Sequence, residues 1–367
     1  IYLSNSTTEA DFRGALTHPS FPERERRSPS ENPTTAPPAT AMLFLPLSGA
    51  YRAPACPPRA SLSACAATTV AEQYATVADQ NYRSVQLIDG LKARDFQHPL
   101  DRETTAALSM LAPIEWSVRQ AFRALNVDEA SFLDNIARGV LVGPDQLPEL
   151  HASMVEACKL LDLDVAPELY VRQDSSPNAY TLAVQGQRPF VVLTTALLDL
   201  MEPREVQAVI AHELGHLKCE HGLFLLLSNL ITSVVLGRSA LGAVLQSNVL
   251  SWQRAAELSC DRAALVVTQD PKVVQSVVMK LAGGSRRFAS SLNVDAFVRQ
   301  AAAYDEAAAS SRTGRMVRRQ QESGATHPLP ILRARELERW AASAEYAQLL
   351  ARGTPTNVER RGGVRRG

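Results

Sequence analysis

Apolar residues along the chain follow two different spacings, which together predict a mainly helical protein with one small sheet. From residue 70 to about 161 they recur every three or four positions, as is typical of amphipathic helices. Three short apolar runs follow at 168–172, 178–184 and 190–194, and they predict strands, with a turn at 185–189. Helical spacing then returns. The predicted fold class is therefore α+β.

The part of the chain after these strands is predicted to be helical, apart from one polar stretch. Glu202-Pro203-Arg204-Glu205 indicates a helix start, because proline is favoured in the first helical turn. Residues 310–324 are polar and are expected to form a loop. The expected helices are 195–201, one that opens at 203, 251–268, 271–281 and 330–350.

An apolar stretch at 223–250 lies between two of these helices. Its main run has about fourteen residues before Gly237 and Arg238 interrupt it. That is short for a helix that crosses a bilayer, which needs roughly 20 residues. Two interpretations stay open: a hairpin that contacts a membrane or lipid surface, and ordinary packing in the core.

Residues 1–69 differ from the rest of the chain in composition. They are rich in Pro, Ser, Thr and Ala, so they bury too little apolar surface to offset the entropy of ordering. Residues 32–71 contain no Asp or Glu, as is typical of an organelle transit peptide, here one that could start at Met42. A plain disordered tail is the alternative. The predicted organisation is a disordered segment at 1–69, a helical region at 70–146, a main domain at 147–350 and a disordered basic tail at 351–367.

Charge and cysteine content narrow the classes of function. Lys and Arg number 38, as do Asp and Glu, so the formal net charge is zero and nothing favours nucleic acid as a partner. The five cysteines form no CxxC pair and no dense framework. This argues for a reducing compartment and against a disulfide-rich secreted domain.

The chemistry of the chain is concentrated in His212-Glu213-Leu214-Gly215-His216. Helix positions four apart lie on the same face, so His212 and His216 present two imidazoles to one ligand. Zinc binds neutral imidazole nitrogen, and Glu213 stands where it can take a proton from water at such a metal. Apolar neighbours predict that this helix is buried, and Gly215 permits close approach of another element. A chance occurrence without metal is the alternative, but buried polar groups without partners are costly.

A catalytic zinc site needs a third protein ligand. Glu257 is the best candidate, and Asp261 lies one helical turn further on the same face. Asp261 could accept a proton from the second nitrogen of a ligand histidine and so orient its ring. A solvated helix face, on which both carboxylates form a charge cluster with Arg262, is the alternative.

Three more residues near the motif are given no metal role. His221 is five residues beyond His216 and points to a different side of a continuing helix, so it is interpreted as a helix-end residue. Cys219 and Cys260 are interpreted as small buried apolar residues.

These motifs together resemble peptidase family M48, which includes the HtpX heat-shock proteases and the CAAX prenyl proteases. The resemblance rests on the HELGH segment, the downstream Glu257 and Asp261, the sequence THPLPILR at 326–333 and the sequence SPNAY at 176–180. It extends from about residue 150 to 340, and the stretch 254–284 is most similar to the chloroplast branch of plants and algae.

The resemblance implies a gluzincin architecture, mainly helical, with a small sheet beside the motif helix. It implies that His212, His216 and Glu257 bind one Zn²⁺ ion per subunit and that Glu213 is the general base. Many relatives have clear transmembrane helices, whereas the apolar stretch of this chain is short.

Four more positions match the family pattern. Asp261 matches the aspartate behind a ligand histidine, and His327 and Arg333 match positions near the cleft. Asn178 matches an asparagine on the edge strand that hydrogen-bonds the substrate backbone.

The expected function is hydrolysis of peptide bonds in protein substrates, in the quality control or turnover of organelle proteins. The expected location is the chloroplast or another plastid, peripheral to or associated with a membrane; a mitochondrial or other organelle membrane is the alternative. Three other classes stay open: a non-catalytic zinc-containing chaperone or adaptor at a membrane or lipid surface, a structural membrane-surface protein, and a different zinc hydrolase. The substrate and the oligomeric state are not predicted.

Overall fold

This computed structural model describes part of the chain. The described residues are 85–109, 133–134, 136–182, 189–222, 224, 240–324 and 327–356, and they belong to one compact unit. The predicted transit segment, residues 185–188 of the predicted turn 185–189, residues 223 and 225–239 of the apolar stretch 223–250, and residues 357–367 of the basic tail lie outside them.

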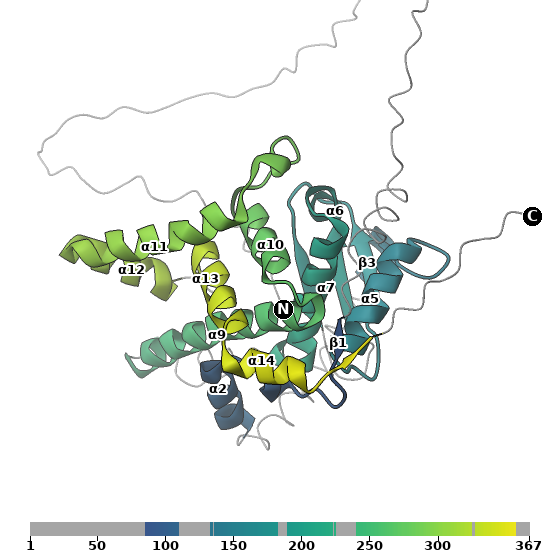
Figure 1. Cartoon of the computed structure of the whole chain (residues 1–367), viewed down its shortest axis with the longest axis horizontal. Helices are drawn as coiled ribbons and strands as arrows, with labels where there is room; N and C mark the ends of the chain where they lie inside the picture. The colour runs from purple at the N-terminus through teal and green to yellow at the C-terminus, as the bar shows by residue number, and fades with distance from the viewer. Residues whose placement is uncertain are drawn as a thin grey trace, which may run out of the picture. The chain divides into compact units, whose positions relative to one another are not determined.

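The described residues form a mainly helical body with a small sheet, so the fold class is α+β as the sequence predicts (Figure 1). The helices are α2 (Pro99–Ser109), α5 (Pro148–Leu160), α6 (Thr195–Leu200), α7 (Pro203–Lys218), α9 (Ala240–Thr268), α10 (Pro271–Gly283), α11 (Val294–Ser310), α12 (Arg312–Gly324), α13 (Pro330–Ala341) and α14 (Ala344–Ala351). The strands are β1 (Gln86–Leu87), β2 (Gly139–Leu141), β3 (Glu168–Arg172), β4 (Ala179–Leu182), β5 (Phe190–Thr194) and β6 (Thr354–Pro355). Two 3-10 turns are η1 (Ala93–Asp95) and η3 (Ala289–Ser291).

The main sheet has four strands in the order β2-β3-β5-β4. Strands β3 and β5 are parallel, and the other two pairs are antiparallel. Val191 and Leu193 of β5 join the main core, while Phe190 and Val192 belong to a small cluster, as alternating side chains on two faces require. Strand β4 is the end strand, and it lies beside α7, the helix of the HELGH motif.

Helix α7 begins where the sequence predicts, and polar contacts hold its first turn. Glu202 and Glu205 form a reciprocal capping box, with Pro203 as the first helical residue. The Glu205 carboxylate also accepts hydrogen bonds from Lys280 of α10 at 2.6 Å and from Ser276 at 2.6 Å. These contacts fix the start of α7 against α10, which forms one wall of the cleft.

Helices α7 and α9 cross at Gly215. A Cβ atom at this position would lie 2.9 Å from the Ala263 Cβ atom and 3.1 Å from the Cys260 Cα atom. Only glycine permits so close an approach, as the sequence indicates. The contact brings α9, and with it Glu257 and Asp261, against the motif helix.

Three predictions about the helices and strands are wrong. Residues 312–324 form α12 instead of a loop, because they pack against α11, where Arg318 bonds Asp305 at 2.9 Å and lies over the Tyr304 ring. Tertiary contacts of this kind can stabilise a helix whose own sequence is polar. The predicted helix 330–350 is two helices, because the Ser343 hydroxyl caps α14 by accepting the Tyr346 N–H. Strands β1 and β2 lie within residues 70–146, which were predicted to be helical.

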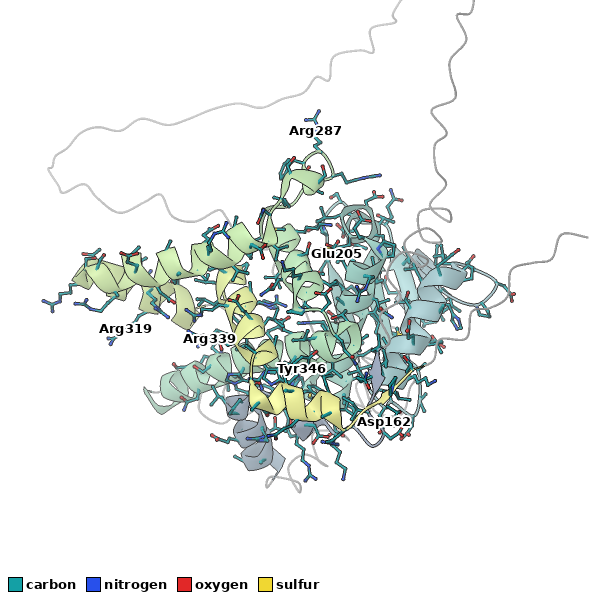
Figure 2. All side chains as sticks on the ribbon, viewed as in Figure 1. Asp162, Glu205, Arg287, Arg319, Arg339 and Tyr346 are labelled. Atoms are coloured by element: carbon teal, nitrogen blue, oxygen red, sulfur yellow. The ribbon has the colours of Figure 1, made fainter. Side chains whose placement is uncertain are left out.

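Helices α11 and α12 extend from the side of the body opposite the sheet (Figure 1). Arg319 of α12 and Arg287, in the loop after α10, point into solvent (Figure 2). Within the described ranges, none of the helices is long and apolar enough to cross a membrane.

Candidate metal centre

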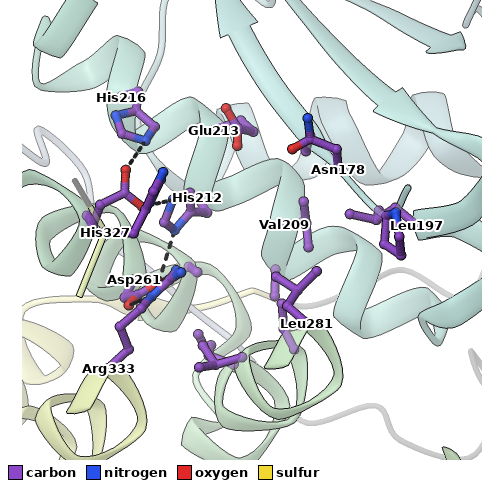
Figure 3. A pocket seen from close by; sticks show the side chains of 18 residues that line it. Asn178, Leu197, Val209, His212, Glu213, His216, Asp261, Leu281, His327 and Arg333 are labelled. Atoms are coloured by element: carbon purple, nitrogen blue, oxygen red, sulfur yellow. Dashed lines mark hydrogen bonds and ion pairs between the residues drawn. The ribbon is translucent and has the colours of Figure 1, made fainter. Parts of the chain in front are cut away.

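All eight residues that the sequence singles out line one cleft of about 280 Å³ (Figure 3). They are Asn178, His212, Glu213, His216, Glu257, Asp261, His327 and Arg333. They come from the edge of the sheet, from α7, from α9, and from α13 with the segment before it. Residues up to 155 positions apart in the chain, from Asn178 to Arg333, therefore share one site.

Three side chains converge as metal donors. His212 and His216 lie one helical turn apart on α7, with ring centroids 5.2 Å apart. Glu257 of α9 places one carboxylate oxygen 3.4 Å from the Nε2 atom of His212 and the other 3.5 Å from the Nε2 atom of His216. Two imidazoles and one carboxylate are a donor set of catalytic zinc sites. The residues present therefore fit a bound metal ion.

The His212 ring is held from behind by Asp261. Its Nδ1 atom is 3.1 Å from an oxygen of Asp261. Arg333 of α13 binds the same carboxylate with two donors, at 2.8 and 2.6 Å. Burial opposes the charge on Asp261, but Arg333 and His212 hold the pKa of this carboxyl below its usual value. Asp261 therefore stays ionised and can orient the ring.

The His216 ring is also held from behind, by a residue to which the sequence assigned no such role. Its Nδ1 atom is 3.0 Å from the Nδ1 atom of His221, and the Nε2 atom of His221 is 3.1 Å from Asp101. The interpretation of His221 as a simple helix-end residue is therefore wrong. Helix α7 stops at Lys218, and Glu220, with φ of 55°, turns the chain back toward His216. A left-handed residue after a helix commonly reverses the chain, although glycine is the usual choice.

The charges in the cleft favour a cation between the donors. Burial opposes a charge on His212, but its hydrogen bonds to Asp261 and Glu257 raise its pKa to about 10. Burial keeps the pKa of His216 well below its usual value. Burial also opposes the charge on Glu257, yet hydrogen bonds from His212 and His327 keep the pKa of Glu257 well below its usual range. The two ionised carboxylates, Glu257 and Asp261, therefore favour positive charge in the site. A divalent cation between the donors can supply that charge.

Glu213 lies beside the donors and is positioned by the sheet. Its side chain is buried, and the hydroxyl of Thr181 on β4 donates to its carboxylate at 2.7 Å. Burial raises the pKa of Glu213 above that of a free glutamate. A raised pKa makes a carboxylate a stronger base, as catalysis near neutral pH requires.

His327 and Asn178 lie at the rim of the cleft. His327 is 44% exposed, and its Nδ1 atom is 3.0 Å from a Glu257 oxygen. Asn178 is exposed and directly precedes β4, and its backbone N–H donates to the hydroxyl of Thr194 at 2.9 Å. Both residues are thus open to a substrate in the cleft.

Cys260 also lies near the two histidines, but it is a poor candidate ligand. Its sulfur is 3.6 Å from the Nδ1 atom of His221, so it lies on the side of His216 that faces away from Glu257. Burial raises the pKa of the Cys260 thiol well above its usual value. A protonated thiol binds metal weakly, and Cys260 is buried as the sequence predicts.

Comparisons of the sequence with known proteins identify its relatives. The sequence pattern of peptidase family M48 matches residues 144–341. The plastoglobule-localized metallopeptidase 48, chloroplastic, of Arabidopsis thaliana is 47% identical over 270 residues, which cover 72% of this chain and 78% of that protein. Protease HtpX homolog 2 of Methanosarcina mazei is 28% identical over 171 residues, which cover 39% of this chain and 58% of that protein.

One solved structure is also similar, the crystal structure of S. mikatae Ste24p. The TM-score is 0.33 and the identity 15%, with 64% of this chain and 63% of the other covered. The family pattern matches more than half of this chain, and the plant relative is similar over most of its own length. The chain therefore belongs to peptidase family M48 and is a metallopeptidase.

Proposed function

We propose that this metallopeptidase is an endopeptidase with one zinc ion per chain, bound by His212, His216 and Glu257. The observation that carries this proposal is the placement of both Nε2 atoms within 3.5 Å of one buried carboxylate. When bound, zinc polarises the carbonyl of the scissile peptide and makes a nearby water more acidic. The donor set and the raised pKa of the neighbouring Glu213 both suit this chemistry.

Glu213 acts as the general base in this proposal. Its carboxylate takes the proton of the attacking water and passes it to the nitrogen of the leaving amine. Thr181 donates to one carboxylate oxygen at 2.7 Å, which leaves the other oxygen for the reacting water. His327 and Arg333 line the same cleft, and we assign them to stabilising the oxyanion or controlling access to the metal.

The substrate binds as an extra strand along the exposed edge of the sheet, next to β4. Support comes from the strand order, in which β4 has a single neighbour among the described strands, and from the contact of β4 with α7. A peptide added at such an edge is bound through its backbone, and Asn178 stands at the start of this edge. Backbone binding suits an enzyme that cleaves protein chains of varied sequence.

The other wall of the cleft is apolar. It is lined by Leu197, Ala208, Val209, Ala264, Val274, Val277, Val278 and Leu281, from α6, α7, α9 and α10. Apolar walls beside a few polar groups are the usual composition of a ligand pocket. We therefore assign this wall to a large apolar side chain of the substrate, next to the scissile bond.

A plastid location at a membrane or lipid surface is part of the proposal. The name of the plant relative and the acid-depleted segment at 32–71 support it. The stretch 223–250 is the proposed contact with that surface. We also propose that the chain divides at residues 69, 146 and 350, with the metallopeptidase domain at 147–350.

The test compares the purified full chain with Glu213→Gln, which keeps the size of the side chain and removes the base. Elemental analysis should find about one zinc ion in both proteins. Cleavage of an unfolded protein substrate should fall by about 10²–10⁴-fold in the variant. Mass spectrometry of the wild-type products should find apolar residues enriched beside the new chain ends.

Glu149→Gln, on the exposed start of α5, is the matched control and should retain full activity. Zinc in both proteins with equal cleavage would contradict the assignment of Glu213. A protein without zinc would contradict the metal site. A zinc protein that cleaves no peptide in either form would indicate a chaperone or adaptor instead.

A further inference from the structure

A continuous line of buried polar side chains leads from the back of His216 to α2. The Nδ1 atoms of His216 and His221 are 3.0 Å apart, and the Nε2 atom of His221 is 3.1 Å from the nearer oxygen of Asp101. His221 is 4% exposed and Asp101 is fully buried. Asp101 also lies outside the residues 144–341 that match the family pattern.

Asp101 is held by three neutral donors as well as by His221. Trp252 donates to one oxygen at 2.9 Å, Ser259 to the other at 2.6 Å, and Thr105 to the first at 3.1 Å. Asp101 also lies in the first turn of α2, where the helix dipole favours negative charge. A carboxylate with this many donors is an acceptor only, so it requires a proton on the Nε2 atom of His221.

For a neutral His221, the position of every proton along the line then follows. A neutral imidazole carries one proton, so His221 with its proton on Nε2 has a bare Nδ1 atom that accepts. His216 must then donate from its own Nδ1 atom, which leaves its Nε2 atom bare. That bare Nε2 atom is the one that faces Glu257 at 3.5 Å. The buried carboxylate thus selects, through one histidine, the form of His216 that can bind a metal ion.

We propose that His221 and Asp101 are positioning residues that fix the ring and the tautomer of His216 for metal binding. This inference rests on the proposed zinc site. It gives His216 the kind of support that Asp261 gives His212, with a histidine placed between the ligand and the carboxylate. Hydrogen-bond partners behind a ligand histidine typically change metal affinity about 10–100-fold.

A second metal ion at this place is the competing interpretation, because Asp101, Cys219 and His221 offer donor atoms close together. The hydrogen bonds argue against it. Both Asp101 oxygens and both His221 nitrogens already have partners. Burial also raises the pKa of the Cys219 thiol well above its usual value, so this sulfur remains protonated.

Two variants of the full chain test the proposal. His221→Phe keeps a ring of similar size but leaves the Nδ1 proton of His216 without an acceptor. His221→Gln keeps the line, because its amide oxygen can accept from His216 and its amide nitrogen can donate to Asp101. Zinc affinity is measured by competition with a fluorescent chelator, and the geometry of the site by the visible spectrum of the cobalt-substituted protein.

Zinc affinity should fall about 10–100-fold in His221→Phe and stay within about threefold of wild type in His221→Gln. The cobalt spectrum should change only in the phenylalanine variant. A His221→Phe protein that is less stable but has wild-type affinity and spectrum would overturn the proposal, because His221 would then serve packing alone. If the wild-type chain itself binds no zinc, the proposed function fails instead, and the two failures are distinguishable.

A measurement on the wild-type protein covers the case in which His221→Phe does not fold. Nitrogen-15 NMR of the zinc-loaded, histidine-labelled chain reads the protonation of each ring nitrogen, and the His221 signals are identified by their loss in His221→Gln. The proposal requires a neutral His221 with its proton on Nε2. A proton on Nδ1, or on both nitrogens, would overturn it.

Discussion

The two histidines of the metal centre present the same atom to the same carboxylate, but they are held from behind in different ways. Behind His212 stand Asp261 and Arg333, which form a charged pair and both line the cleft. Behind His216 stand His221 and Asp101, which are buried and have mostly neutral partners. We call these the Asp261–Arg333 pair and the His221–Asp101 pair.

This difference shows that the residues behind the metal ligands extend beyond the part of the chain that matches the family pattern. The Asp261–Arg333 pair lies within residues 144–341, which match the family pattern. The His221–Asp101 pair reaches back to α2, ahead of that range. The N-terminal part of the described chain therefore contributes a residue, Asp101, to the support of the metal centre.

Deletion of residues 1–143 should have the largest effect, because it removes Asp101 and with it the His221–Asp101 pair. It also removes Ile88, Leu91 and Phe96, each at most 1% exposed. Burial of one such side chain contributes about 1.5–3 kcal/mol, and a folded domain has only about 5–15 kcal/mol in total. We expect no folded protein, as measured by circular dichroism and thermal unfolding. Deletion of residues 1–69 alone is the control and should leave the fold intact.

Asp261→Asn should weaken zinc binding about 10–100-fold, since it removes the charge that orients His212 and that Arg333 binds. Chelator competition measures the effect on the full chain. Comparison with His221→Phe then tells which pair contributes more to metal affinity. Wild-type zinc affinity in Asp261→Asn would show that Asp261 has no orienting role.

Gly215→Ala acts on both pairs together, because it pushes α9 away from α7. The new Cβ atom would lie 2.9 Å from the Ala263 Cβ atom. Such overpacking costs about 1–3 kcal/mol, partly offset by the better helix propensity of alanine. Urea unfolding should show a net loss of stability. Gly283→Ala, where the added atom meets nothing within 4 Å, is the matched control and should show no loss.

Asp305 belongs to neither pair, so Asp305→Asn should have the smallest effect on stability and none on zinc affinity. Burial opposes its charge slightly, but Arg335 and Arg318 hold the pKa of Asp305 below its ordinary value of 3.8. A lowered pKa in the folded state adds stability that is present above about pH 4 and is lost as the pH falls through the folded-state value. The variant should be less stable by under about 1 kcal/mol at pH 7, because the group is partly exposed.

This difference should shrink as the pH falls below about 4 and vanish below the folded-state pKa, where Asp305 is protonated in the wild type as well. Thermal unfolding at a series of pH values measures it, with zinc affinity unchanged throughout. A difference that stayed unchanged as the pH falls through the acid range would mean that the carboxylate charge is not its source.

Local spacing in the sequence determined the elements of the metal centre. Four-residue spacing on a helix put His212 beside His216 and Glu257 beside Asp261. Apolar runs predicted the strand that follows Asn178 and carries Thr181, which bonds Glu213. These predictions need only the geometry of one helix or one strand. The structure places the candidate residues in one cleft; their roles stay predictions until the variants are measured.

Only the tertiary structure decided what stands behind His216. Helix periodicity puts His221 on the wrong side, because it cannot foresee that α7 ends at Lys218 and that the left-handed Glu220 reverses the chain. Asp101 lies 120 residues before His221, and no local pattern connects them. The same reason explains α12, a polar stretch that is helical because it packs on α11. Contacts between distant segments depend on how whole elements pack, and the spacing within one segment carries no information about them.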